Sequence, residues 1–159
     1  IGAGGVMAAE MAGRARGGWV VAALSLMCQS QGPAARVLTA AHAMTDVTGF
    51  GLLGHLRNIC RASGVGAQLD LSEVPLMPGA LTLAEQGIRS TIYPDNRAAL
   101  PALPDNPVTD LLFDPQTAGG LLAAVPGDAT ALLDALKAKG YHAALIGHIT
   151  DRADQIEVD

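Results

Sequence analysis

Aromatic residues are scarce in this chain, which has two Phe, two Tyr and one Trp among 159 residues. Half of the residues are hydrophobic, and most of these are Ala, Leu and Val. Because aromatic side chains bury the largest areas, a core without them must consist of many small, closely packed contacts. A chain of this length buries somewhat under about 70% of its unfolded surface on folding, which is enough for one domain. We therefore expect residues 1–159 to form a single domain.

Basic residues are also few, with ten Lys and Arg against fifteen Asp and Glu and a formal net charge of -5. A nucleic-acid-binding surface needs clustered Lys and Arg, and here they are scattered. No apolar run approaches the roughly 18 residues that span a bilayer, since the run from Trp19 to Cys28 is bounded by Gly18 and Gln29. We expect a soluble protein that binds neither nucleic acid nor membrane.

Cysteine is nearly absent, and neither Cys28 nor Cys60 belongs to a Cys-x-x-Cys pair. Both lie in apolar helical patterns, where a free Cys usually behaves as a small buried hydrophobe. This predicts a reduced, cytoplasmic protein. The histidines match no common zinc spacing, so we expect them to be satisfied in the core or on the surface. They are His42, His55, His142 and His148.

Hydrophobic periodicity predicts helices and strands that are mixed without strict alternation. The expected helices are residues 5–16, 20–27, 33–38, 50–61, 79–86 and 128–139, with a single helical turn at 97–100 in an otherwise irregular segment 90–107. The expected strands are residues 42–47, 65–71, 108–113, 120–125, 143–150 and 155–158. This order predicts an α+β domain with a mixed β-sheet covered by helices.

The segment 45–56, Thr-Asp-Val-Thr-Gly-Phe-Gly-Leu-Leu-Gly-His-Leu, places Asp46 on a glycine-containing turn ahead of an apolar helix. Gly49 and Gly51 allow the main chain to approach a ligand closely, and the first turn of a helix offers unpaired N–H groups and partial positive charge. A carboxylate supplies the hard oxygen that Mg²⁺ prefers. These features indicate a metal-phosphate site at Asp46. The alternative is that Asp46 only caps the turn.

Together with a second segment at 112–122, Leu-Phe-Asp-Pro-Gln-Thr-Ala-Gly-Gly-Leu-Leu, this motif resembles the C-terminal half of the selenide, water dikinases, also called selenophosphate synthetases. Further segments at 2–6, 74–80 and 146–149 follow in the order expected of that family, so the resemblance covers nearly the whole chain. Aminoimidazole ribonucleotide synthetase, thiamine monophosphate kinase and the hydrogenase maturation dehydratase are expected to share the fold but to differ at both motifs. The resemblance implies the C-terminal domain fold of aminoimidazole ribonucleotide synthetase-like proteins.

The resemblance further implies that the parent protein converts ATP, selenide and water into selenophosphate, AMP and phosphate with Mg²⁺ as cofactor. It gives Asp46 the role of a metal ligand that helps to hold the ATP phosphates. The residues implied to shape the nucleotide site are Thr45, Thr48, Gly49 and Gly51 on the first motif, and Asp114 and Thr117 on a second polar turn facing the same cleft. A purely structural role for the second turn stays open, because Asp-Pro commonly opens a turn between strands. Ala118 stands where the family often has Ser, and Gly119-Gly120 would permit close packing of a strand on a helix.

The chain begins at Ile1, without an initiator Met and inside a family motif, so we expect it to be a fragment. The resemblance implies an N-terminal domain that supplies the reactive Cys or selenocysteine, an essential Lys, most metal carboxylates and the contacts of a homodimer. Neither Cys28 nor Cys60 inherits the nucleophile's role. This chain would add Asp46 and one wall of the cleft and would be inactive alone.

Two alternatives stay open. One is a non-catalytic module that packs on a partner domain and binds nucleotide weakly or not at all. The other is an ATP-using relative that acts on an amide or a small phosphate ester. The sequence leaves undecided whether the parent uses Cys or selenocysteine, where its selenium comes from, whether another domain is fused upstream, and how the fragment associates.

Overall fold

A computed structural model describes residues 1–99 and 103–159 of the chain. The fold class is α+β, as predicted. The chain divides into two compact units, which we describe separately. Unit 1 comprises residues 1–29, 47–55 and 76–119, and unit 2 comprises residues 30–46, 56–75 and 120–159. Helix α4 (Gly51–Ser63) runs from unit 1 into unit 2.

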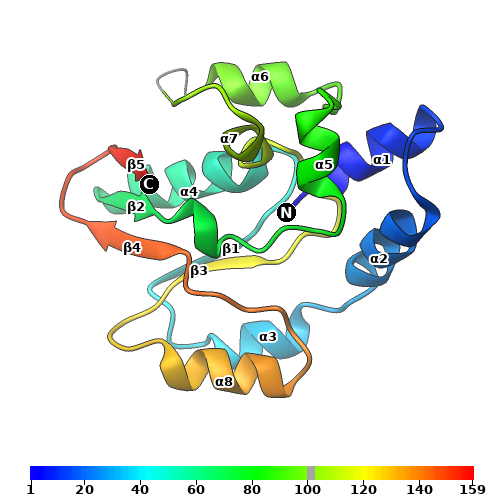
Figure 1. Cartoon of the computed structure of the whole chain (residues 1–159). Helices are drawn as coiled ribbons and strands as arrows, with labels where there is room; N and C mark the ends of the chain where they lie inside the picture. Colours follow the sequence, from blue (N-terminus) through cyan, green and yellow to red (C-terminus); the bar gives the residue numbers. More distant parts are fainter. Residues whose placement is uncertain (100–102) are drawn as a thin grey trace. The chain divides into compact units, whose positions relative to one another are not determined.

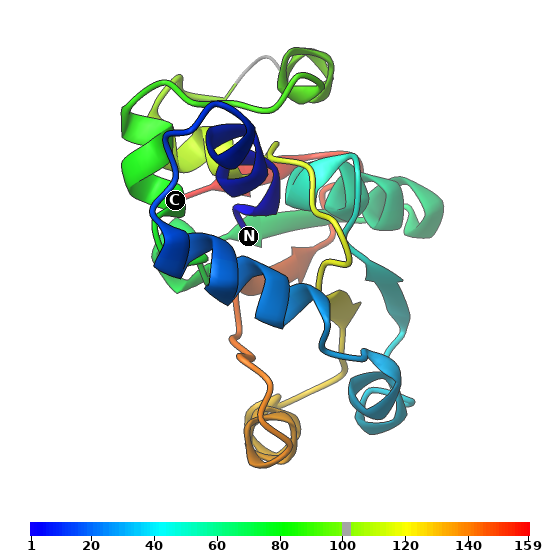
Figure 2. The ribbon, with the colours of Figure 1, turned by 90° about the vertical axis from the view of Figure 1, so that its right-hand side faces the viewer.

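Unit 1 is helical in the part that the structure describes. Its complete helices are α1 (Ala3–Met11), α2 (Gly17–Met27), α5 (Ala80–Glu85), α6 (Tyr93–Ala98) and α7 (Pro107–Leu111). Figure 2 shows α1 and α2 as the two blue helices that follow one another along the chain. The prediction of two helices joined across Gly17-Gly18 is confirmed, although α2 already begins at Gly17.

Small side chains form the core between α1, α2 and α5, as the composition predicts. Val6 and Ala9 of α1 pack with Ala23 of α2 and Leu83 of α5, all at 1% exposure or less. Trp19 packs against this cluster. Gly79 precedes α5 in the left-handed conformation, and a side chain there would collide with the Trp19 ring. The close approach of the two segments therefore requires glycine at this turn.

The predicted strand at 108–113 is wrong, because this segment begins with helix α7. Pro107 occupies the first helical turn, where its missing N–H costs nothing. The Asn106 side chain caps the helix, since its Oδ1 accepts hydrogen bonds from the N–H groups of Val108 (3.1 Å) and Thr109 (2.9 Å). A short segment whose apolar residues are interrupted only by Thr109 and Asp110 is compatible with either structure, and here the Asn-Pro start decides for the helix.

All described strands belong to unit 2, and they form two small sheets rather than one. In the first, β1 (Ala43–Asp46) pairs antiparallel with β3 (Leu121–Ala124), so that Asp46 lies opposite Leu121. In the second, the order is β4-β2-β5, with β2 (Gly66–Leu69) antiparallel to β4 (Gly147–Thr150) and parallel to β5 (Ile156–Val158). Figure 1 shows both sheets. The second is mixed, as predicted for the domain as a whole.

The helices of unit 2 are the C-terminal part of α4, α3 (Gly32–Val37), α8 (Thr130–Ala138) and the 3₁₀ turn η1 (Leu71–Glu73). Ala34 and Leu38 pack with Leu136 of α8, and Leu121 and Ala123 of β3 pack on this cluster. Helices α3 and α8 are both seen nearly end-on in Figure 2, so their axes are nearly aligned. Pro33 lies in the first turn of α3, as predicted.

Several smaller predictions need correction. Residues 143–146 do not belong to β4, which begins at Gly147. The helical turn predicted at 97–100 is replaced by α6 at Tyr93–Ala98, and Leu100 lies outside the described residues. Cys28 is exposed because it caps the C-terminal end of α2, whereas Cys60 in α4 is buried as predicted.

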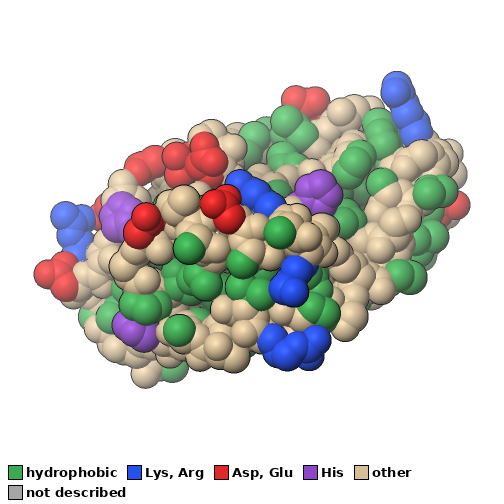
Figure 3. Space-filling model, turned by 90° about the horizontal axis from the view of Figure 1, so that it is seen from below, with side chains coloured by type: hydrophobic (Ala, Val, Ile, Leu, Met, Phe, Trp, Pro, Cys, Tyr) green, Lys and Arg blue, Asp and Glu red, His purple; other side chains and the backbone are tan. Residues whose placement is uncertain are grey.

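Two further predictions concern membrane-spanning segments and the distribution of basic residues. No helix among the described residues is long and apolar enough to cross a membrane. On the face that Figure 3 shows, Lys and Arg side chains are separated from one another by other residues. This distribution agrees with the scattered basic residues of the sequence.

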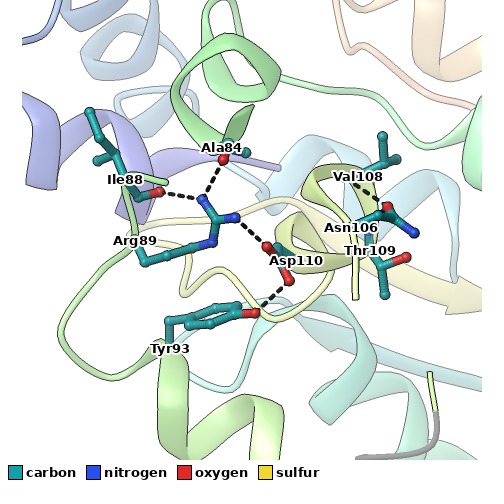
Figure 4. Close-up of polar contacts among 8 residues, drawn as sticks. All are labelled: Ala84, Ile88, Arg89, Tyr93, Asn106, Val108, Thr109 and Asp110. Carbon is teal, nitrogen blue, oxygen red and sulfur yellow. Dashed lines mark hydrogen bonds and ion pairs between the residues drawn. The ribbon is translucent and has the colours of Figure 1, made fainter. Parts of the chain in front are cut away.

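A partly buried ion pair joins α5, α6 and α7 in unit 1. Figure 4 shows the Arg89 guanidinium between the carbonyl oxygens of Ala84 and Ile88 and the carboxylate of Asp110, to which it is paired. The Tyr93 hydroxyl donates to the other oxygen of Asp110. Burial and this hydrogen bond to Asp110 raise the pKa of Tyr93. Because each member is satisfied by the others, the cluster links three short helices, of which α6 contributes no buried side chain.

Removing Asp110 leaves the Arg89 charge without its partner, so we expect Asp110→Ala to lower the free energy of unfolding by about 3 kcal/mol. Urea unfolding monitored by circular dichroism measures this loss. The control Asp105→Ala removes an exposed carboxylate just before α7 and should stay within about 0.5 kcal/mol of the wild type. Equal losses in the two variants would contradict the role given to the ion pair.

Candidate functional site

The loop at residues 47–51, which connects β1 to α4, is hydrogen-bonded to the second motif within unit 1. The Thr48 carbonyl accepts from the N–H groups of Gln116 (3.0 Å) and Gly51 (3.1 Å). One turn further, the Leu53 N–H donates to the Leu112 carbonyl at 3.1 Å. The two motifs, more than 50 residues apart in sequence, therefore form one backbone assembly.

Two glycines allow this close contact. A Cβ atom on Gly119 would collide with the Val47 carbonyl oxygen, whereas a Cβ on the neighbouring Gly120 would meet nothing within 4 Å. Gly51 has φ +71°, and a Cβ there would lie 2.8 Å from the Leu112 carbonyl. The prediction for Gly119-Gly120 therefore needs refinement, because Gly119 approaches the loop after β1 rather than a helix.

The Asp114 and Gln116 side chains hold the start of α1. Gln116 Oε1 accepts from the N–H groups of Gly2 (3.1 Å) and Ala3 (3.2 Å), and Asp114 Oδ2 accepts from the Gly4 N–H at 2.9 Å. Gln116 Nε2 in turn donates to the Asp114 carbonyl and carboxylate. A carboxylate at a helix N-terminus pairs unsatisfied N–H groups with negative charge. The second motif therefore acts as the cap of α1, the structural role that the sequence left open.

Burial raises the pKa of Asp114 from its ordinary value of 3.8 to about 6, while hydrogen bonds from Gln116 and the Gly4 N–H act in the opposite direction. The residue is only 5% exposed. Removing the carboxylate from water therefore destabilises its charged form more than the hydrogen bonds that it accepts stabilise it. Asp114 is an acid whose charge changes in the mildly acidic range.

Asp46 lies at the end of β1 in unit 2, and its side chain is exposed. Among the described residues, none donates a hydrogen bond to its carboxylate, so the cap that we considered as an alternative is not formed. Thr45 precedes it and donates through Oγ1 to the Asp46 carbonyl at 3.1 Å. The carboxylate is free to bind a cation.

The other predicted residues belong to unit 1. Thr48, Gly49 and Gly51 lie together on the loop, and Asp114 lies on the turn hydrogen-bonded to it. Thr117 is exposed on the same turn. Of the main-chain donors that we expected at the nucleotide, the Gly51 N–H already donates to the Thr48 carbonyl. The Leu53 N–H in the first turn of α4 likewise donates to a protein carbonyl, that of Leu112.

A complete metal site is not built from the described residues alone, since they contain no group of three or more His, Cys, Asp and Glu side chains placed to hold an ion. Asp46 fits Mg²⁺ as one oxygen ligand, with the remaining ligands coming from elsewhere. Nucleotide phosphates and water commonly supply such ligands.

Three residues with defined contacts here were not assigned a site role from the sequence. Gln116 caps α1, His55 Nε2 accepts from the Thr48 N–H at 3.0 Å, and Asn96 Nδ2 donates to the Gly49 carbonyl at 2.8 Å. His55 confirms the expectation of a satisfied histidine, since it is buried and hydrogen-bonded. Gln116 and His55 lie inside the two motifs at 45–56 and 112–122, and this position could have indicated a role in the site. Asn96 lies in a segment that we expected to be irregular.

These features define a class of protein: an α+β domain in which a strand ends at an exposed carboxylate and the glycine-containing loop that follows is hydrogen-bonded to an Asp-Pro-Gln turn. Within this class, the chain belongs to the family described as AIR synthase related protein, C-terminal domain, which matches residues 1–159.

Curated relatives of the chain include selenide, water dikinases. The chain is 44% identical to that of Shewanella sp. (strain MR-7) over 120 residues, which is 72% of this chain and 34% of the relative. It is 37% identical to that of Bordetella bronchiseptica (strain ATCC BAA-588 / NCTC 13252 / RB50) over 166 residues, which covers 99% of this chain and 48% of the relative. The chain thus spans about a third to a half of the length of these relatives.

Solved structures support the fold. The Escherichia coli hydrogenase maturation protein HypE matches 99% of this chain and 42% of its own with a TM-score of 0.65 and 18% identity. A crystal structure of HypE in complex with ATP matches 75% of this chain and 32% of its own with a TM-score of 0.50 and 21% identity. These matches agree with the predicted aminoimidazole ribonucleotide synthetase-like fold.

We expect Gly119→Ala to displace the loop at residues 47–51, because its methyl group would occupy the space of the Val47 carbonyl. The free energy of unfolding should fall by about 2 kcal/mol or more. Gly120→Ala is the matched control and should change it by less than about 1 kcal/mol. Thermal or urea unfolding of both variants measures the difference, and indistinguishable curves would show that the close approach is unimportant.

The raised pKa of Asp114 predicts a pH dependence. Between pH 4 and about 6 the folded protein holds the Asp114 proton while the unfolded chain has released it, so this group's contribution to stability falls as pH rises through that window. Asp114→Asn keeps an oxygen acceptor for the Gly4 N–H and removes the titration.

Urea unfolding at pH 4.5 and pH 7 tests this prediction. The stability of the wild type relative to Asp114→Asn should be lower at pH 7 by about 1–3 kcal/mol. Parallel pH profiles for the two proteins would contradict the raised pKa.

Proposed function

We propose that this chain is the C-terminal part of a selenide, water dikinase, in which Asp46 contributes a metal ligand at the ATP phosphates. The observation that carries the proposal is the exposed Asp46 carboxylate, unpaired among residues 1–99 and 103–159, directly before a loop whose main chain is held by the second motif. The names of the relatives and the ATP complex of a HypE structure support an ATP-dependent reaction.

Mg²⁺ bound at Asp46 would neutralise charge on the phosphate oxygens, which is the main source of catalysis in phosphoryl transfer. The chain's own residues present the carboxylate and hold the loop. Thr45, Thr48, Gly49 and Gly51 shape the nucleotide site through their main chain, and the Thr117 hydroxyl is exposed for a direct contact. The Asp114 carboxylate is occupied by the start of α1. Asp114 therefore acts indirectly, by supporting the turn whose Gln116 N–H donates to the loop.

The reaction consumes both phosphoanhydride bonds of ATP, with selenide and water as acceptors and selenophosphate, AMP and phosphate as products. We propose that a preceding N-terminal domain supplies the nucleophile-handling residues, the other metal carboxylates and the contacts of a homodimer. Residues 1–159 then form one C-terminal domain that lines one wall of the cleft. In this account the protein is cytoplasmic and the isolated chain is inactive.

The test follows ³¹P NMR of the full-length protein with Mg-ATP, with and without selenide. We expect selenide-dependent AMP and selenophosphate from the full-length protein and none from residues 1–159 under the same conditions. Selenophosphate from the isolated chain would contradict the division of labour, and no selenide response from the full-length protein would contradict the proposed reaction and favour a binding module.

Asp46→Asn removes the charge that binds the cation but keeps the shape of the side chain. We expect turnover to fall at least about 100-fold, with an unchanged circular dichroism spectrum, because Asp46 is exposed and stabilises no described contact. The control Asp134→Asn removes an exposed carboxylate from α8 and should leave turnover unchanged. Full activity of Asp46→Asn would exclude the ligand role.

A further inference from the structure

Two side chains from different helices bind the main chain of the loop at residues 47–51. His55, in the second turn of α4, accepts the Thr48 N–H at Nε2 (3.0 Å) and lies 3.1 Å from the Thr48 hydroxyl. Asn96, in α6, donates from Nδ2 to the Gly49 carbonyl (2.8 Å). The two side chains therefore bind adjacent residues of the loop, Thr48 and Gly49. All four residues belong to unit 1.

The chemistry of each contact is specific. A backbone N–H can only donate, so Nε2 of His55 must carry a lone pair, and the neutral ring bears its proton on Nδ1. Asn96 uses its amide nitrogen twice, since Nδ2 also donates to the Phe113 carbonyl at 3.0 Å. It thus joins the loop to the residue that precedes the Asp-Pro-Gln turn. Neither an apolar residue nor a carboxylate could replace the Asn96 donor.

Part of the loop is open to solvent, and a Cβ atom on Gly49 would meet nothing within 4 Å. Phe50, between Gly49 and Gly51, is 62% exposed, and its ring lies 5.7 Å from that of His55. The loop therefore combines residues fixed by hydrogen bonds with an exposed residue between Gly49 and Gly51. A segment of five residues with two glycines loses much conformational freedom when it is ordered. If the loop is already ordered in the folded protein, this entropy cost is met during folding and does not weaken ligand binding.

We propose that His55 and Asn96 are positioning residues, which fix the Thr48-Gly49 segment so that the chain leaving Asp46 keeps one conformation before metal and nucleotide bind. This inference rests on the proposed function, because it assigns the fixed loop to the Asp46 metal site. Neither side chain contacts the reacting atoms. They act through the main chain two and three residues beyond Asp46.

The experiment measures Mn²⁺ binding to the full-length protein with a non-hydrolysable ATP analogue, using electron paramagnetic resonance to count free Mn²⁺. His55→Ala and Asn96→Ala should each weaken the Asp46-dependent Mn²⁺ site about tenfold in protein that remains folded by circular dichroism. His55→Gln should recover most of the affinity, because its Oε1 can accept the Thr48 N–H. His142→Ala and Asp95→Asn, at exposed positions, are the matched controls and should bind as the wild type.

A merely structural role would lower the unfolding midpoint and leave Mn²⁺ affinity unchanged, and that result overturns the proposal. Asp46→Ala, measured in parallel, separates the two hypotheses. If Asp46→Ala binds Mn²⁺ normally, the proposed function fails; if Asp46→Ala weakens binding and the His55 and Asn96 variants do not, only the positioning role fails.

A second measurement does not depend on the variants folding. Long-range ¹H–¹⁵N spectra of the wild type should show His55 neutral with an unprotonated, hydrogen-bonded Nε2. A proton on Nε2 would show that His55 does not accept from Thr48 and would overturn its assigned role.

Discussion

The hydrogen bond between the Gln116 N–H and the Thr48 carbonyl is the contact on which the site depends, because it joins the two motifs within unit 1. Around it, Gly119 lets the turn approach the Val47 carbonyl, and the Asp114 and Gln116 side chains reach the other way to the first amides of α1. One short turn thus satisfies a helix N-terminus and fixes the loop that follows Asp46. Because the Asp-Pro-Gln turn is hydrogen-bonded both to the start of α1 and to the loop, its conformation is fixed whether or not it contacts a ligand.

The two carboxylates of the motifs, Asp46 and Asp114, lie in different environments. Asp46 is exposed and unpaired among the described residues, whereas Asp114 is buried, accepts from Gly4 and has a pKa of about 6. A cation ligand needs access and charge, and a helix cap needs burial and hydrogen-bond donors. The environments of the two residues therefore point to a metal role for the first and a structural role for the second.

Much of this could be predicted from the sequence. The α+β class, α4 after the glycine loop and the strand ending at Asp46 follow from periodicity and turn residues. Periodicity could not assign the segment 108–113, because so short and mostly apolar a segment fits strand and helix alike until Asn106 is seen to cap α7. Likewise, the partners of His55 and Asn96 are backbone groups, which carry no sequence signal, and the raised pKa of Asp114 depends on burial that only the folded chain creates.

The central claim is that a preformed loop presents Asp46 to a metal-nucleotide complex. A crystal structure of the full-length protein with Mg²⁺ and a non-hydrolysable ATP analogue tests it most directly. The account predicts an Asp46 oxygen about 2.1 Å from Mg²⁺, with the hydrogen bonds of Thr48 to Gln116 and His55 retained. A bound Mg-nucleotide that Asp46 does not contact, or a loop that breaks these hydrogen bonds on binding, would contradict it.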